Sequence, residues 1–258
     1  MGLITETSLR AMLGSGRGLP NPFPIGAEDR VTPAAADFLK DRRIGLRRIA
    51  PGREAGALIP VGVSNRHVHL SPSHVEVLFG RGSRLHSLRE LSQKGQFAAQ
   101  ETVTLVGPKG EIPGVRVLGP SRGVTQVEIS QTDGRQLGVA PAVRLSGDLA
   151  GTPGILIRGP AGAVVLSEGL IVARNHVHLS TDDAARLSVQ HGDRLLLQSL
   201  GDRPIVFADA TARVDERFSL DFHIDTDEAN AAFLRTGDVV RLVGINMNIA
   251  DLFRERQT

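Results

Sequence analysis

Four short stretches of the chain share one frame of alternating polar and apolar residues: HVHLS at 67–71, QVEIS at 126–130, HVHLS at 176–180 and DFHID at 221–225. Each stretch ends on Ser or Asp, the side chains that cap helix N-termini, and a helix-like segment follows. Because side chains alternate along a strand, the apolar residues of each copy share one face. The frame therefore predicts a strand that runs directly into a helix, built four times.

The alternation divides each copy into a core face and a polar face. Residues two apart on a strand lie on the same face, with Cα atoms roughly 6.5 Å apart. The apolar residues predicted to face the core are Val68, Leu70, Val127, Ile129, Val177, Leu179, Phe222 and Ile224. The polar residues of the opposite face are His67 and His69, Gln126 and Glu128, His176 and His178, and Asp221 and His223.

The polar faces are rich in metal-ligating side chains. A lone His-x-His pair on a strand is usually a solvated polar face. Here the pair occurs twice in one frame, and the equivalent position holds Glu128 in the second copy and His223 in the fourth. Six such ligands are too many for one tetrahedral zinc, but they suit two metals with roughly three protein ligands each and positions left for substrate. The predicted ligands are His67, His69, Glu128, His176, His178 and His223.

Composition narrows the classes of function. The 258 residues contain no Cys, which excludes disulfides, thiolate ligands and a cysteine nucleophile, and fits a cytoplasmic protein. Trp and Tyr are also absent, and the net charge is only +2 without a block of like charges, so a nucleic-acid partner is not expected. No stretch approaches the roughly 20 apolar residues of a membrane span, and the N-terminus lacks the pattern of a signal peptide.

The chain changes character near residue 58. Before it, residues 4–13 and 32–43 are predicted helices, separated by the Gly/Pro-rich segment GSGRGLPNPFPIG. This part is either a flexible arm or an amphipathic docking helix on a tether. From residue 58 on, strand-length apolar runs alternate with Gly-rich turns, which predicts a mixed, mainly β body with few, short helices.

Several longer motifs resemble one family. IPVGVSNRHVHLS, VTQVEISQTD, LSGDLAGTPGILIRGPAG, VARNHVHLS and HIDTDEANAA are similar to motifs of the PduL-type phosphate acyltransferases, over about residues 58–245. The resemblance implies the reaction acyl-CoA + phosphate ⇌ acyl phosphate + CoA, with a propanoyl or acetyl group and two Zn²⁺ per chain. It implies two small β-barrels capped by short helices, the first from 58–65 plus 174–245 and the second from 66–173, between an N-terminal extension, 1–57, and a tail, 246–258.

The resemblance also assigns roles to residues. It implies that His67, His69 and Glu128 hold one zinc and that His176, His178 and His223 hold the other. Arg122 matches the phosphate-binding arginine, and Glu101 is a rival acid outside the frame. The implied CoA contacts are Val63, Ser64, Asn65, Lys109, Arg116 and Asn230. Asn175 departs from the family pattern, where Arg is common, without an expected effect on metal binding.

Without Cys an acyl-thioester enzyme is impossible, so we expect direct transfer with both substrates bound. A two-metal acyl-CoA or phosphoester hydrolase and a non-catalytic, metal-binding shell-associated protein are the alternatives. The family implies a bacterial microcompartment as location, with the N-terminal helix contacting shell or cargo proteins. Acyl-chain preference, oligomeric state (a homo-oligomer is compatible with the sequence), the metal used in the cell and the reaction direction do not follow from the sequence.

Overall fold

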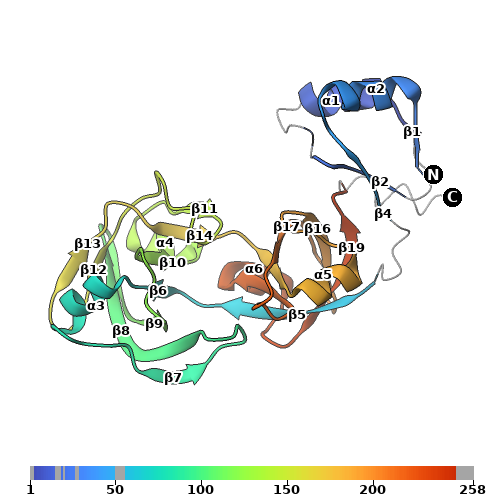
Figure 1. Cartoon of the computed structure of the whole chain (residues 1–258). Coiled ribbons are helices and arrows are strands. Elements are labelled where there is room, and N and C mark those ends of the chain that lie inside the picture. Colours follow the sequence, from blue (N-terminus) through green and yellow to red (C-terminus); the bar gives the residue numbers. More distant parts are fainter. Residues whose placement is uncertain (1–2, 15–18, 20, 27–28, 50–55, 248–258) are drawn as a thin grey trace.

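The computed structural model describes residues 3–14, 19, 21–26, 29–49 and 56–247. Figure 1 shows three bodies in a row, an N-terminal one, a barrel and a larger sheet. The mainly β class predicted from the sequence is confirmed. Most of the predicted C-terminal tail, from residue 248 on, lies outside the described residues. Among the helices in the described ranges, none is long and apolar enough to cross a membrane.

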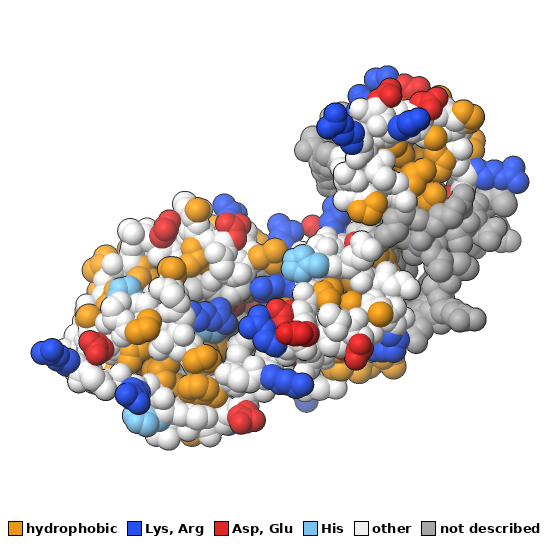
Figure 2. Space-filling view, viewed as in Figure 1, with side chains coloured by type: hydrophobic (Ala, Val, Ile, Leu, Met, Phe, Trp, Pro, Cys, Tyr) orange, Lys and Arg blue, Asp and Glu red, His pale blue; other side chains and the backbone are white. Residues whose placement is uncertain are grey.

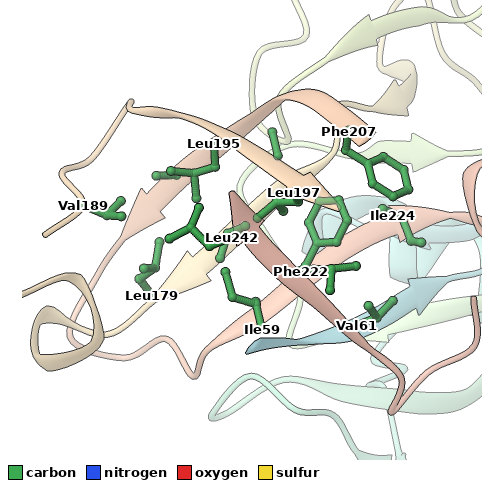
Figure 3. Close-up of a cluster of buried hydrophobic side chains, with 14 of the residues drawn as sticks. Ile59, Val61, Leu179, Val189, Leu195, Leu197, Phe207, Phe222, Ile224 and Leu242 are labelled. Atoms are coloured by element: carbon green, nitrogen blue, oxygen red, sulfur yellow. The ribbon is translucent and has the colours of Figure 1, made fainter. Parts of the chain in front are cut away.

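The barrel is a closed sheet in the order β15-β17-β16-β19-β5-β18. Its strands are β5 (Leu58–Ser64), β15 (His176–Leu179), β16 (Arg194–Ser199), β17 (Val206–Val214), β18 (Asp221–Asp225) and β19 (Val239–Ile245). Strand β5 therefore joins a barrel whose other strands come more than a hundred residues later. Phe207 and Phe222 meet inside it, with ring centroids 5.0 Å apart, among the aliphatic side chains of Figure 3.

The larger sheet lies between β5 and β15 in the chain. Its strands are β6 (His67–His69), β7 (Ser87–Glu90), β8 (Phe97–Gly107), β9 (Gly110–Gly119), β10 (Gln126–Glu128), β11 (Ala142–Arg144), β12 (Leu156–Arg158), β13 (Ala163–Val165) and β14 (Leu170–Ala173). They follow the order β11-β14-β10-β6-β9-β8-β12-β13, with β7 beside β8. Two barrels were expected, but over the described strands this sheet does not close, because the short end strands β11 and β13 each pair on one side only.

Each copy of the repeated frame forms the predicted strand-to-helix unit. The helices are α3 (Pro72–Phe79), α4 (Gln131–Leu137), α5 (Thr181–Leu187) and α6 (Thr226–Ala232). Their N-caps are Ser71, Ser130, Ser180 and Asp225, whose side chains all accept a backbone N–H from the first turn. The eight apolar residues predicted to face the core are all buried, at 3% exposure or less. The alternation in the sequence thus predicted both the caps and the core face.

The N-terminal residues carry more structure than the flexible extension that was predicted. They form α1 (Glu6–Gly14) and α2 (Pro33–Asp41), with the strand pairs β1 (Leu3–Ile4) with β3 (Arg30–Val31) and β2 (Phe23–Gly26) with β4 (Leu46–Ile49). The Thr32 side chain caps α2 by accepting the Ala35 N–H. The segment read as an irregular linker ends in β2. These N-terminal elements are ordered because they share a small hydrophobic core, built from Leu9, Phe23, Ile25, Ala35, Phe38 and Leu39.

Candidate metal centre

The four copies of the frame form two pairs, one in the larger sheet and one in the barrel. In the larger sheet β6 and β10 are antiparallel, which places His67 opposite Glu128 and His69 opposite Gln126. In the barrel β15 and β18 are antiparallel, which places His176 opposite His223. Each pair of copies therefore contributes two ligands from a His-x-His strand and one from its neighbour, because antiparallel pairing brings the polar faces of both strands to the same side.

The first cluster consists of His67, His69 and Glu128, whose potential ligand atoms lie within 4.8 Å of one another. His67 Nε2 is 3.5 Å from Glu128 Oε2, and His69 Nε2 is 3.9 Å from Glu128 Oε1. Both histidines are buried. Gln126 donates from Nε2 to Glu128 Oε1, the same oxygen that faces His69, and so holds the carboxylate in place.

The second cluster consists of His176, His178 and His223, again with potential ligand atoms within 4.8 Å of one another. The ring centroids of His176 and His178 are 4.7 Å apart, and those of His178 and His223 are 4.6 Å apart. Phe218 packs against His178 at 4.2 Å between centroids and covers one side of the cluster. Three imidazoles at this spacing match the donor set of a catalytic zinc site with three protein ligands.

Hydrogen bonds define which ring nitrogen is free in two of the histidines. His67 Nδ1 lies 2.8 Å from the carbonyl oxygen of Asn65, and His176 Nδ1 lies 2.8 Å from that of Arg174. A carbonyl only accepts, so Nδ1 carries the proton and Nε2 keeps its lone pair. The Nε2 lone pair of His67 then faces the Glu128 carboxylate at 3.5 Å, an arrangement of two acceptors that a cation between them would stabilise. The residues present therefore fit a bound metal ion.

Burial keeps three of the histidines neutral at pH 7. It is the main cause that lowers the pKa of His69 to about 3, of His176 to about 4 and of His178 to about 2, and neighbouring imidazoles add to each shift. Burial also lowers the pKa of His67, but Glu128 outweighs it and the pKa ends above its ordinary value. Neutral imidazoles are the form that binds metals.

Both clusters open into one cleft between the barrel and the larger sheet. Its lining residues are Ser64, Asn65, Arg66, His67, Glu128, Ile129, Ser130, Ala173, Arg174, His176, His223, Ile224 and Asp225. Burial raises the pKa of Glu128, but His67 and His69 of its own cluster and His176 of the other cluster outweigh burial and lower it. At one edge the Thr132 amide of α4 donates to Asp227 Oδ2 of α6 at 2.8 Å and joins the two bodies.

Comparisons with known proteins identify the family of the chain. A family model described as phosphate propanoyltransferase matches residues 60–235. The chain belongs to the phosphate propanoyltransferase family. Membership makes it an acyltransferase enzyme. Proteins named phosphate propanoyltransferase match it in Thermotoga maritima (57% identical, covering 72% of this chain and 89% of the relative), Rhodobacter capsulatus (50%, covering 72% and 86%) and Salmonella typhimurium (51%, covering 67% and 83%).

Two arginines lie near the clusters. Arg122, the phosphate-binding arginine that the resemblance implies, follows β9 and donates from Nη1 to Ser146 Oγ at 3.2 Å. Burial lowers its pKa, Glu128 opposes that shift, and the positive charge of Arg213 adds to it. Arg213, on β17 beside His178, was missed by sequence reasoning, although a charged residue in the apolar run VFADATARV was a usable signal. Both guanidiniums interact with Glu128, so both belong to the same site.

The residue before each His pair contacts an acidic side chain in the first turn of a helix. Arg66 forms an ion pair with Asp133 at 2.7 Å, and Asn175 donates from Nδ2 to Glu228 Oε1 at 2.6 Å. Asp133 and Glu228 are the N3 acids of the capping boxes of α4 and α6. Asn175, the departure from the family pattern, thus makes the same type of contact as its counterpart Arg66.

Of the CoA contacts that the family resemblance implies, some line the cleft and others lie outside it. Ser64 and Asn65 line the cleft, after Val63 on β5. Arg116 pairs with His67 on the neighbouring strand and donates to the carbonyls of β8. Asn230 is exposed on α6, on the barrel side.

Lys109 lies elsewhere, in the β8–β9 turn. Its backbone bonds to Leu137, and its side chain packs where a Cβ of Gly138 would stand, at the end of α4. None of the contacts described for it reaches the cleft.

The other candidate side chains have partners outside the clusters. Glu101, the rival acid, bonds to His86 with 2.7 Å between Oε1 and Nδ1. His74 bonds to Thr125 through Nδ1 at 2.7 Å. Glu128 is therefore the carboxylate that the fold brings to His67 and His69.

Proposed function

We propose that the protein catalyses acyl-CoA + phosphate ⇌ acyl phosphate + CoA, with a propanoyl or acetyl group, at the cleft between its two clusters. The observation that carries the proposal is the shared cleft itself. Two clusters of three metal-ligating residues border it, and the family to which the chain belongs is named for phosphate propanoyl transfer.

His67, His69 and Glu128 would hold one Zn²⁺, and His176, His178 and His223 would hold the other. Bound there, the two cations would supply positive charge for the phosphate and for the developing thiolate of CoA. The neutral state of three of the histidines and the free Nε2 of His67 and His176 support this role.

Arg122 and Arg213 would orient the phosphate. A guanidinium presents its N–H donors in a planar fork that matches two phosphate oxygens. Glu128 opposes the lowering of the pKa of both arginines, so both guanidiniums are within electrostatic reach of its carboxylate, and an anion bound within reach of both would be stabilised by each. This fixes one phosphate oxygen toward the thioester.

Val63, Ser64, Asn65 and Asn230 from the barrel, and Arg116 from the larger sheet, would contact CoA. Figure 2 shows basic side chains gathered where the barrel meets the larger sheet, which suits a ligand that carries a pyrophosphate and a 3′-phosphate. Lys109, carried over from the family, would have to reach such a ligand from the β8–β9 turn.

In the transfer, a phosphate oxygen attacks the thioester carbonyl carbon and forms the C–O bond. The C–S bond breaks, and CoA leaves as a thiolate that takes up a proton. Because the chain has no Cys, both substrates are bound when the acyl group moves. Double-reciprocal plots should intersect, and parallel lines would contradict direct transfer.

The decisive experiment combines a metal assay with phosphate-dependent CoA release from propanoyl-CoA. The wild type should hold two metals per chain, and His69→Ala and His223→Ala should each lose one metal and most of the activity. Two metals and full activity in both variants would overturn the site. Release of carboxylate without phosphate would indicate a hydrolase, and metal binding without turnover would indicate a non-catalytic protein.

We also propose a microcompartment location mediated by the N-terminal body, as the family resemblance implies. The structure changes how that contact would work. Leu9 of α1 is buried in the small N-terminal core, so the bare apolar face of this helix is not available. Exposed apolar side chains of the folded body, such as Leu3 and Leu46, are the surface it would present.

A further inference from the structure

In the second and fourth copies of the repeated frame, the first polar position is not a histidine. In the fourth copy this residue is Asp221, which is 7% exposed. Its Oδ2 lies 2.9 Å from Nε2 of His223. An ionised carboxylate can only accept, so His223 Nε2 donates and Nδ1 keeps the lone pair. The carboxylate thus selects which nitrogen of His223 is free.

The Asp221 carboxylate is held in turn by the other body. Ser92, in the loop between β7 and β8 of the larger sheet, donates from Oγ to Asp221 Oδ2 at 3.2 Å. The next residue, Gln93, is buried and makes two hydrogen bonds to the backbone of Ser219: Nε2 donates to its oxygen at 3.3 Å, and Oε1 accepts from its nitrogen at 3.2 Å. The β7–β8 loop therefore holds the chain at the start of β18 through hydrogen bonds, two to four residues before His223.

A glycine of the barrel leaves room for this carboxylate. Gly62 on β5 is the ladder partner of His223. A Cβ at Gly62 would stand 2.6 Å from Asp221 Oδ2, closer than real side chains approach. A glycine is needed there to leave room for the carboxylate, although its backbone is ordinary β-strand.

We propose that Asp221 is a positioning residue that orients His223 for metal binding, and that Ser92 and Gln93 couple this orientation to the docking of the larger sheet on the barrel. The inference rests on the proposed two-metal site. Carboxylates that accept from a ligating histidine fix its tautomer and ring orientation, and their loss weakens metal binding by about 10- to 100-fold.

The test measures Zn²⁺ affinity by competition with a chromophoric chelator, one site at a time. His69→Ala disables the first cluster and leaves the barrel site, whereas His178→Ala leaves only the first cluster. In the His69→Ala background, Asp221→Ala should weaken the remaining site by about 10- to 100-fold. In the His178→Ala background the same change should leave the affinity unaltered, which separates positioning from general misfolding.

Graded variants sharpen the result. Asp221→Asn keeps the shape and one acceptor oxygen, so it should recover part of the affinity lost in Asp221→Ala. Gly62→Ala should weaken the barrel site by displacing the carboxylate without touching it chemically, and Ser92→Ala should weaken it less. Matched controls are Asp202→Asn, an exposed aspartate in the β16–β17 loop of the barrel, and Gly45→Ala, where a Cβ meets its nearest atom at 3.7 Å.

The possible failures are distinguishable. If the wild type binds no metal at His176, His178 and His223, the proposed two-metal function fails. If the wild type binds two metals and Asp221→Ala keeps wild-type affinity at the barrel site, only the positioning role is overturned. Equal losses at both sites would also overturn it, since they would indicate a general structural defect.

Discussion

Single residues of this site are prepared for their chemistry by short-range contacts. His67 and His176 each bond through Nδ1 to a carbonyl two residues earlier, Asn65 and Arg174 respectively. The first histidine of the tripeptide HVH therefore has the same tautomer in two different sheets. Burial also lowers the pKa of His176 to about 4, so its Nε2 lone pair stays unprotonated at pH 7.

One consequence is an acid-sensitive apo-protein. His69, His176 and His178 have pKa values of about 3, 4 and 2 when folded, below the ordinary value of 6.5. Below pH 6.5 the unfolded chain binds protons that the folded chain does not. The free energy of unfolding therefore decreases as the pH is lowered, by up to about 1.4 kcal/mol per histidine and pH unit. His67, with its raised pKa, acts in the opposite direction.

Urea denaturation of EDTA-treated protein between pH 7.5 and 5 checks this. Stability should decline through that range, and His69→Ala should show a shallower slope because one proton-binding group is gone. Stability that stays constant or rises toward pH 5 would contradict the assignment of neutral buried histidines.

The two arginines give a second prediction at this scale. Arg122→Ala and Arg213→Ala should each lower kcat/KM for phosphate by roughly 10- to 100-fold, because a hydrogen bond to a charged group contributes about 1.5–3 kcal/mol. Arg213→Lys should recover a part. Arg217→Ala is the control, since Arg217 is exposed and pairs with Asp215. Saturation kinetics in phosphate decide, and an unchanged KM and kcat in Arg213→Ala would remove Arg213 from the site.

At the scale of elements, the unit is a short strand that passes directly into a capped helix. The caps are close to the ligands: Glu128 is followed within two residues by Ser130, the N-cap of α4. In α4 and α6 the cap is a reciprocal capping box. Because the cap fixes the direction in which the chain leaves the strand, it also limits where the last strand residues can lie.

Loss of a cap should therefore cost stability at this junction. Ser130→Ala removes the acceptor for the Asp133 amide, and we expect a loss of about 0.5–2 kcal/mol. Thermal and urea denaturation measure it, with Ser167→Ala, an exposed serine in the β13–β14 loop, as control. Equal stability of the two variants would show that the capping box of Ser130 and Asp133 does not stabilise the strand-to-helix unit.

At the scale of the whole molecule, the site belongs to neither body alone. The barrel supplies one cluster, the larger sheet supplies the other, and the cleft between them is closed at its edge by the bond from Thr132 to Asp227. Strand β5 enters the barrel and β6 leaves it for the larger sheet within three residues. Only Asn65 and Arg66 separate the two strands, so the bodies are connected directly beside the ligands.

The N-terminal body is separate from this arrangement. Deletion of residues 1–55 should leave phosphate-dependent CoA release within about twofold of the full chain, since the family model begins at residue 60. Gly56 and Ala57 are kept because their backbones bond to Leu242 of β19. Loss of activity in a folded truncated protein would contradict this. Co-purification with microcompartment shells is the second readout, and unchanged packaging would exclude a docking role.

The sequence by itself determined the local features. Alternation assigned the core faces, the Ser and Asp residues marked the helix starts, and the repeated frame selected the six candidate ligands. These are properties of neighbouring residues, so reading along the chain was sufficient. Even the choice of Glu128 over Glu101 followed from the frame, and the fold then brought Glu128 to His67 and His69.

Only the tertiary structure decided the rest. It paired two copies of the frame in each body, kept the larger sheet open, packed the N-terminal residues around Leu9, brought Arg213 to His178 and brought the β7–β8 loop to Asp221. Each of these depends on contacts between residues far apart in the chain, such as Ser92 with Asp221. A local pattern contains no information on which distant backbone will approach it, because that is set by the packing of whole sheets.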